Sequence, residues 1–165
     1  MERRLDYQKV LPEGMRVIYA LNRYSEQSGL EPKLSKLIKV RASQINGCAY
    51  CIDMHTKEAR SGGETEQRLY GLNAWHETPY YTERERAALA LTEAVTLISE
   101  THVPDEIYQQ AQQHFNDEEL VKLMIAINMI NLWNRLVITF RTPPGSYEPD
   151  HFVTTPHEVV TSEAK

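Results

Sequence analysis

The sequence predicts an all-α protein, a single-domain bundle of about six or seven helices. From residue 12 to residue 140, nearly every cluster of apolar residues repeats at a spacing of three or four, which is the period of an amphipathic helix. Two capping boxes, TERE at 82–85 and NDEE at 116–119, mark helix starts. No alternation of apolar and polar residues is long enough to predict a sheet, although RLVITF at 135–140 is locally β-prone.

The order of the helices follows from these signals and from the prolines. Pro12 and Pro32 each open an apolar stripe, and proline suits a first helical turn because it has no amide hydrogen to leave unpaired. Pro104 opens a later helix with acidic residues in its first turn, which the helix dipole favours. The predicted helices cover residues 12–28, 33–46, 48–61, 65–73, 82–99, 104–115 and 117–140.

The length of 165 residues suits one domain with a real core. We therefore assign residues 1–140 to the helical domain. Residues 141–165 hold four of the eight prolines and few consecutive apolar residues. They are predicted to form a Pro-rich C-terminal arm that is extended or disordered.

The charge pattern excludes several classes of function. The net charge is −5, and acidic and basic residues are interspersed, so no basic stripe for nucleic acid and no polybasic membrane patch is present. The N-terminus lacks an apolar leader, and asparagines interrupt the longest apolar stretch. With seven glycines and no Gly-rich turn, the chain has no nucleotide-cofactor motif. We expect a cytoplasmic protein with no bound cofactor, no nucleic acid partner and no membrane partner.

The stretch QINGCAYCIDMHTKEAR holds both cysteines of the chain. Gly47 breaks the preceding helix, so Cys48 is predicted to start the next one. On that helix Cys51 lies one turn further and His55 lies four residues after Cys51, so all three share a face. A thiolate is favoured by a helix N-terminus or a nearby imidazolium, and a second cysteine within reach turns a sulfenic acid into a disulfide. The pattern predicts redox chemistry.

Other interpretations of this segment remain open from the residues alone. A structural zinc ion needs four ligands, and the segment supplies three. His55 on a helix is by default a core histidine. The identity of the attacking sulfur is also open, because the helix N-terminus favours Cys48 whereas the imidazole at four residues favours Cys51.

The run RASQINGCAYCIDMHTKEAR, with TERERAALALTEAVT and INMINLWNRL, resembles the alkylhydroperoxidase AhpD-like branch of the carboxymuconolactone decarboxylase family over roughly residues 10–140. The resemblance implies an all-α fold, a homotrimer or hexamer, and reduction of organic hydroperoxides through a sulfenic acid and an intramolecular disulfide. It also implies an external dithiol reductant such as a lipoylated protein. In its terms Cys51 attacks, Cys48 resolves and His55 belongs to a proton relay.

The sequence departs from the pattern of that branch at two positions. Lys36 replaces a glutamate twelve residues before the first cysteine, and Tyr50 replaces a histidine between the two cysteines. A lysine ammonium cannot accept the imidazole proton. Lys36 is therefore either a charge that stabilises a thiolate or a solvated surface residue. We hypothesise that Glu93, on an apolar helix face, orients His55 or the hydroxyl of Tyr50; a salt bridge or an oligomer contact is the alternative.

The last predicted helix carries a polar stripe of Asn128, Asn131 and Arg135, at intervals of three and four. None of these side chains is a good acid or base, so the stripe predicts a hydrogen-bond network between helices or across a subunit interface.

Two functions follow from the sequence. The first is a dithiol peroxidase that acts on organic hydroperoxides in an antioxidant relay. The second is a redox-sensing or binding protein, in which the disulfide forms slowly and the Pro-rich tail contacts a partner. Lactone decarboxylation is the weakest reading, because that reaction has no need of two neighbouring thiols.

Overall fold

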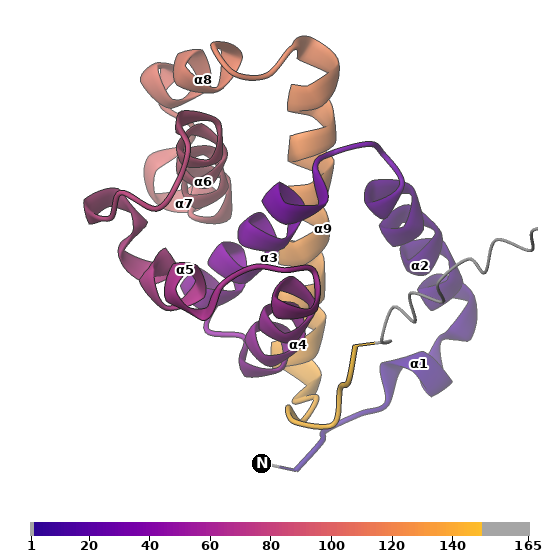
Figure 1. The fold of residues 1–165 in the computed structure, drawn as a ribbon. Coiled ribbons are helices and arrows are strands. Elements are labelled where there is room, and N and C mark those ends of the chain that lie inside the picture. The colour runs from indigo at the N-terminus through magenta and orange to yellow at the C-terminus, as the bar shows by residue number, and fades with distance from the viewer. Residues whose placement is uncertain (1, 150–165) are drawn as a thin grey trace, which may run out of the picture.

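The computed structural model describes residues 2–149, and every regular element in that range is a helix (Figure 1). In chain order these are α1 (Tyr7–Val10), α2 (Pro12–Glu26), α3 (Pro32–Asn46), α4 (Ala49–Ser61), α5 (Glu66–Gly71), the 3-10 helix η1 (Leu72–Glu77), α6 (Glu83–Thr96), α7 (Ile98–Thr101), α8 (Asp105–Gln112) and α9 (Asp117–Phe140).

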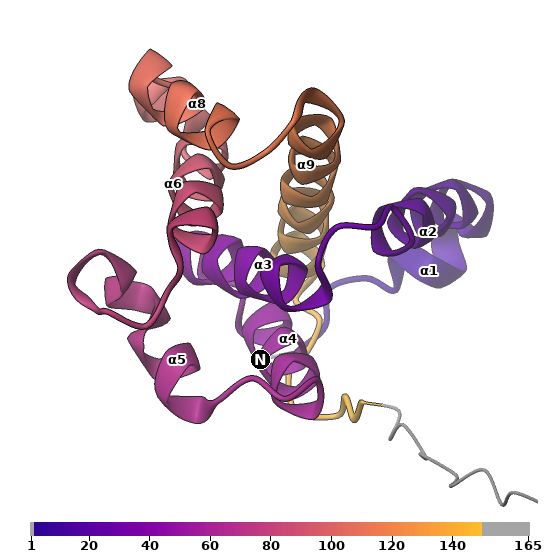
Figure 2. The same cartoon turned by 45° about the horizontal axis from the view of Figure 1, so that its top comes forward.

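The long helix α9 stands at the centre of the bundle. Figures 1 and 2 show α1 and α2 on one side of it, α6 and α8 on the other, and α3 crossing it. Helix α3 packs against α4, α6 and α9, whereas α2 packs mainly against α9. The main core lies where α3, α6 and α9 meet, and its fully buried side chains include Leu34, Ile38, Leu91, Leu123 and Ile127.

Both predicted capping boxes are formed. The Thr82 hydroxyl accepts a hydrogen bond from the Glu85 amide at 3.2 Å, and the Glu85 carboxylate accepts one from the Thr82 amide at 2.8 Å. Asn116 and Glu119 make the same reciprocal pair at 2.9 Å in both directions. The β-prone run 135–140 lies inside α9, because the contacts of that helix with the core override local propensity.

The structure differs from the prediction in three short segments. The expected helix over 82–99 divides at Leu97, whose backbone leaves the helical region, into α6 and α7. In place of the expected helix over 65–73, the α-helix α5 ends at Gly71 and the 3-10 helix η1 follows it directly, with a backbone kink at Ala74. Helix α1 has four residues, a single turn, which is too short for a periodic signal.

Polar side chains connect α3 to α9. The Asn46 amide donates to the side-chain oxygens of Asn131 and Asn134, both at 2.9 Å. Asn134 is fully buried and donates to the Ser43 hydroxyl at 3.1 Å. Arg135 donates to Asn131 at 2.9 Å. A network between helices is therefore present, but of the predicted stripe only Asn131 reaches another helix, since the hydrogen bonds of Asn128 and Arg135 stay within α9. The network fixes the end of α3 directly before the first cysteine.

Helix α9 is the one helix in residues 2–149 that is long and apolar enough to cross a membrane by length and composition. In this fold it is the central helix, and its buried residues face α3 and α6. The buried part of its apolar surface belongs to the helical core.

After α9 the chain turns back along α4. Residues 142–149, which we call the return segment, form no helix, and the Gly145 amide donates to the Asp53 carboxylate at 3.1 Å. The return segment is the described part of the predicted C-terminal arm; residues 150–165 of that arm lie outside the described residues.

Candidate functional site

A left-handed turn places the two cysteines. Gly47 ends α3 with φ 67° and ψ 32°, a conformation that glycine adopts without steric cost. Cys48 follows as the N-cap residue of α4, as predicted, and its amide donates to the Ser43 carbonyl at 3.0 Å. The Cys48 amide is thus bonded to α3, and Asn46, two residues earlier, is bonded to α9. Both helices therefore hold the start of α4 in place.

Cys48 and Cys51 form a disulfide, with their sulfurs 2.21 Å apart. Both side chains are buried, and they pack with Ala42, Ile130 and Val137. The two sulfurs differ in access, since Cys51 lines a cavity and Cys48 does not. The oxidised dithiol therefore presents one of its two sulfurs to that cavity.

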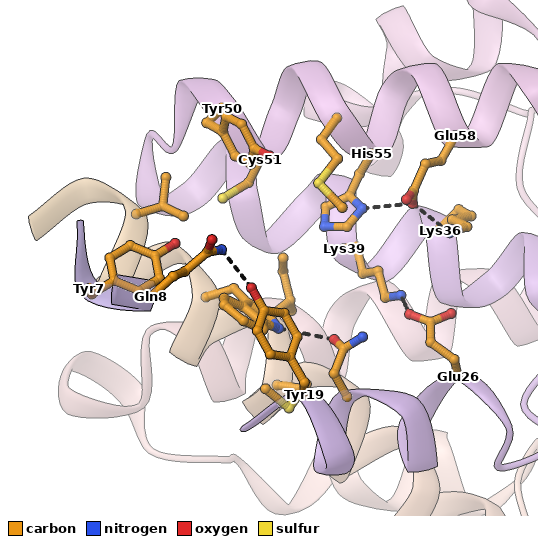
Figure 3. Close-up of a pocket in the computed structure, with 16 residues that line it drawn as sticks. Tyr7, Gln8, Tyr19, Glu26, Lys36, Lys39, Tyr50, Cys51, His55 and Glu58 are labelled. Atoms are coloured by element: carbon orange, nitrogen blue, oxygen red, sulfur yellow. Dashed lines mark hydrogen bonds and ion pairs between the residues drawn. The ribbon is translucent and has the colours of Figure 1, made fainter. Parts of the chain in front are cut away.

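The cavity has a volume of about 340 Å³ and lies between α1, α2, α3, α4 and α9 (Figure 3). One wall is apolar and aromatic, and two ion pairs line the other. The apolar and aromatic residues are Tyr7, Tyr19, Tyr50, Met54, Met129, Ile130, Trp133 and Val137. The polar and charged residues are Gln8, Asn22, Glu26, Lys36, Lys39, Cys51, His55 and Glu58.

His55 lies one turn after Cys51, on the same side of α4 (Figure 3). Its Nδ1 is 3.0 Å from Glu58 Oε2. Burial lowers the pKa of His55, and the bond to Glu58 only partly opposes this, so the imidazole is neutral at pH 7. An ionised carboxylate can only accept, so Nδ1 carries the proton and Nε2 is left as the basic nitrogen.

Glu58 is the carboxylate of the site. Its Oε2 accepts from His55 and also from the Lys36 ammonium at 2.5 Å, while its Oε1 accepts from the Tyr147 hydroxyl at 2.9 Å. Burial alone would raise the pKa of Glu58. The hydrogen bonds and charges of His55 and Lys36 outweigh burial and hold the pKa of Glu58 well below its usual range. Glu58 is therefore ionised at pH 7.

A second ion pair closes the same side of the cavity. Lys39 from α3 is buried and pairs with Glu26 from α2. Burial lowers the pKa of Lys39 despite this partner. The positive charges of Lys39 and Lys36 also lower the pKa of His55, which keeps its imidazole neutral.

Of the predicted site residues, all except Glu93 lie at the cavity or directly beside it. Cys51, His55 and Tyr50 line the cavity, and burial followed by the charge of Tyr7 raises the pKa of the Tyr50 phenol. Cys48 lies directly behind Cys51. Lys36 is not a solvated surface charge, because it is paired with Glu58 at the cavity wall.

Glu93 is held away from the cavity. Its carboxylate accepts from the Arg41 guanidinium at 2.8 Å and from the Trp75 indole at 2.7 Å, and it lies 3.2 Å from His76 Nε2. These partners engage both of its oxygens. The structure therefore does not bring Glu93 to His55 or Tyr50; the alternative interpretation, a salt bridge, describes its contact with Arg41, and the carboxylate beside His55 is Glu58.

Sequence reasoning missed Glu58, although a signal for it was present. Cys48, Cys51, His55 and Glu58 are spaced by three, four and three residues, which places all four on one face of a helix. Lys39 and Glu26 left no comparable signal, because their pairing joins two helices through the tertiary fold.

The arrangement is suited to thiol chemistry. His55 Nε2 can take a proton from a reduced Cys51, and Glu58 stabilises the imidazolium that results. Within residues 2–149, no group of three or more His, Cys, Asp or Glu side chains is arranged to hold a metal ion.

The chain is similar to several known proteins. The profile of the Carboxymuconolactone decarboxylase family matches residues 12–94. The uncharacterized protein YdfG of Bacillus subtilis is 48% identical over 138 residues, which cover 84% of this chain and 94% of YdfG.

Two solved structures have the same fold. A protein of unknown function from Agrobacterium tumefaciens, described as a candidate antioxidant defence protein AhpD, superposes with a TM-score of 0.86 at 46% identity, covering 88% of this chain and 100% of that one. A peroxidase-related protein from Ralstonia eutropha with an alkylhydroperoxidase AhpD core superposes with a TM-score of 0.74 at 21% identity, covering 84% and 74%. The second similarity concerns the fold alone.

Proposed function

Since this chain belongs to the carboxymuconolactone decarboxylase family and has an AhpD-like fold, we propose that it is a dithiol peroxidase that reduces organic hydroperoxides. One observation carries the proposal. Cys51 of the Cys48–Cys51 pair opens on the same cavity as His55 and Glu58, so a nucleophile, a base and an orienting carboxylate meet in one buried space.

The proposed reaction starts from the reduced dithiol. His55 Nε2 takes the proton of Cys51, and the thiolate attacks one oxygen of the hydroperoxide, so that the O–O bond breaks. The alcohol leaves with a proton returned by the imidazolium, and Cys51 becomes a sulfenic acid. Cys48 then attacks the Cys51 sulfur, water is released, and the disulfide that results is the pairing seen here.

The exposure of the two sulfurs supports Cys51 as the attacking thiol. Cys51 lines the cavity and lies four residues before His55, whereas Cys48 is fully buried behind it. The N-cap position that favours a thiolate at Cys48 also suits the resolving role, since resolution requires a thiolate as well.

The cavity wall supports an organic hydroperoxide as the substrate. The side chains of Ile130, Trp133 and Val137 form an apolar surface on which a carbon skeleton can be buried. The volume of about 340 Å³ is within the range of small-molecule sites.

Recycling of the disulfide requires an electron source, for which we propose an external dithiol such as a lipoylated protein. We also propose a homotrimer or hexamer and a cytoplasmic location. Apolar side chains exposed on α1 and α2, such as Val10 at 63% and Val17 at 71%, support assembly through that face.

The alternative, a redox-sensing or binding protein without efficient turnover, is favoured by Lys36 and Tyr50 in place of the usual glutamate and histidine. The contact between Glu58 and His55 weakens that argument, because a carboxylate is available from another position. Repeated turnover with a dithiol donor separates the two functions.

The direct test is the intact mass of reduced protein after exposure to one equivalent of an organic hydroperoxide for seconds, followed by thiol alkylation. We expect rapid loss of both alkylation sites through an intramolecular disulfide, which neither single Cys→Ser variant can form. Cys48→Ser should trap a sulfenic acid on Cys51, whereas Cys51→Ser should not. If both thiols stay free in the wild type, the proposed peroxidase function is wrong.

A further inference from the structure

The return segment, residues 142–149, is attached to α4 beside the site. The Lys57 ammonium donates to the main-chain carbonyl of Tyr147 at 2.8 Å, and Asp53 accepts from the Gly145 amide at 3.1 Å. Lys57 and Asp53 are also paired with each other at 3.3 Å. One charged pair on α4 therefore holds the backbone of the return segment at two points.

This attachment brings the Tyr147 hydroxyl to Glu58. The hydroxyl donates to Glu58 Oε1 at 2.9 Å, whereas Oε2 accepts from His55 and Lys36. The carboxylate thus has donors from α4, from α3 and from the return segment. Each of its oxygens is engaged, and the side chain is only 16% exposed.

The terminal torsion of a glutamate side chain is soft, so one hydrogen-bonded oxygen alone does not fix the plane of the carboxylate. Lys36 has a flexible side chain and can follow Glu58 if it turns. The tyrosine ring is stiffer, and its backbone is held by Lys57. Tyr147 is also a neutral donor, so it adds a hydrogen bond without adding to the positive charges of Lys36 and Lys39 that already act on His55.

We propose that Tyr147 is a positioning residue for the thiol chemistry of Cys51: by holding Glu58 Oε1, it keeps Glu58 Oε2 on His55 Nδ1, and so keeps His55 Nε2 free as the base. The inference rests on the proposed function for its role in turnover, but its effect on the reactivity of the Cys51 thiol can be measured in reduced protein without any turnover. The C-terminal return segment is accordingly part of the site.

Three variants of the full-length protein test this. Tyr147→Phe removes the hydroxyl and keeps the ring. Tyr70→Phe is the matched control, because Tyr70 also donates to a glutamate, Glu66, at 2.9 Å, but on the exposed surface of α5. Lys57→Met removes the hydrogen bond to the Tyr147 carbonyl, one of the two that hold the backbone of the return segment, without removing a donor to Glu58.

Two readouts avoid hydroperoxide altogether. The first is the rate at which iodoacetamide alkylates Cys51 in reduced protein across a range of pH, with the modified cysteine identified by peptide mass. The second is the ¹⁵N spectrum of the His55 side chain, which distinguishes a proton on Nδ1 from one on Nε2.

In Tyr147→Phe we expect alkylation of Cys51 at pH 7 to slow by about three- to tenfold, the effect of one hydrogen bond, with the profile displaced to higher pH. The His55 spectrum should change from the Nδ1 proton alone to a mixture. Lys57→Met should change both readouts in the same direction, and Tyr70→Phe should behave as the wild type.

Unchanged alkylation in Tyr147→Phe would overturn the proposal, and so would slower alkylation with an unchanged His55 spectrum, which would indicate a purely structural effect. If Tyr147→Phe does not fold, Lys57→Met decides by the same criteria. Because no peroxide is used, a wild type that fails to turn over hydroperoxide leaves this test intact.

Discussion

At the scale of single residues, the chemistry of the site depends on Glu58. It combines two opposing effects, since burial disfavours its charge whereas His55 and Lys36 stabilise it more strongly. The negative charge of Glu58 lies beside His55 Nδ1, and it stabilises the imidazole most strongly when that ring becomes protonated. A buried carboxylate of this kind makes a neutral histidine a stronger base at the moment of proton transfer.

We predict that Glu58→Gln slows alkylation of Cys51 at pH 7 by about ten- to a hundredfold, because a hydrogen bond to a charged group contributes about 1.5–3 kcal/mol. The pKa of His55, which Glu58 raises, should fall further, as followed by NMR titration. Glu93→Gln is the matched control, since Glu93 is also partly buried but bonds to Arg41 and Trp75. Equal rates for the two variants would refute the role of Glu58.

The residues of the site were predictable to different degrees. Cys48, Cys51 and His55 share one helix, so their spacing alone brings them together. Glu58 shares that face, but the family resemblance places the relay glutamate at the position that Lys36 occupies, so Glu58 was not predicted. Tyr147 lies almost ninety residues further along the chain. No local period records such a contact, since it depends on where the return segment lies after α9.

At the scale of elements, the site depends on the junction of α3 with α9. Asn134 is fully buried in the middle of α9 and bonds to both Asn46 and Ser43 on α3. These contacts hold the residues directly before Gly47 and Cys48. Asn131 and Asn134 therefore serve the site indirectly, by fixing the turn from which α4 starts.

We predict that Asn134→Ala lowers the free energy of unfolding by about 2–3 kcal/mol, because buried polar groups on α3 lose their partners and a small void is left. Asn128→Ala is the control on the same helix: Asn128 is exposed and bonds only within α9, so its change should stay within about 0.5 kcal/mol. Chemical denaturation measures both. Similar losses for the two variants would contradict the role assigned to the junction.

Long elements were predicted better than short ones. Helices α2, α3 and α9 begin at prolines or a capping box and carry regular apolar spacing over fifteen residues or more, so their limits agree with expectation to within two residues. The prediction ends a helix at residue 73 and assigns residues 74–77 to no helix, whereas η1 extends to Glu77 through a backbone kink at Ala74. Such kinks are set by packing, here around buried Trp75.

At the scale of the whole molecule, the shifted pKa values act together on stability. The pKa values of Glu58 and Glu93 are lowered on folding. Each therefore stabilises the folded protein above the unfolded glutamate pKa of about 4.3, and this contribution is lost as the pH falls below it. The pKa of His55 is also lowered, so the unfolded chain takes up a proton there first, below about pH 6.5.

We predict that the free energy of unfolding decreases from pH 7 to pH 4, in a first part that belongs to His55 and a second, steeper part below pH 5 that belongs to the carboxylates. Denaturant titrations at several pH values measure the profile. His55→Gln should remove the first part and keep the second. Stability that is constant or rises over this range would show that the buried groups do not titrate as described.

The cavity brings two further sulfur atoms close to the chemistry. Met54 and Met129 line the same cavity as Cys51. Peroxides also oxidise thioethers, and the resulting methionine sulfoxides are reversed only by a dedicated reductase. A hydroperoxide that is not consumed promptly at Cys51 has these side chains as its next targets, and a sulfoxide would place a polar group on an apolar wall. If the protein acts as the peroxidase proposed above, its lifetime under oxidant stress should therefore depend on how fast the disulfide is recycled, because every delay leaves these two thioethers exposed to unreduced hydroperoxide.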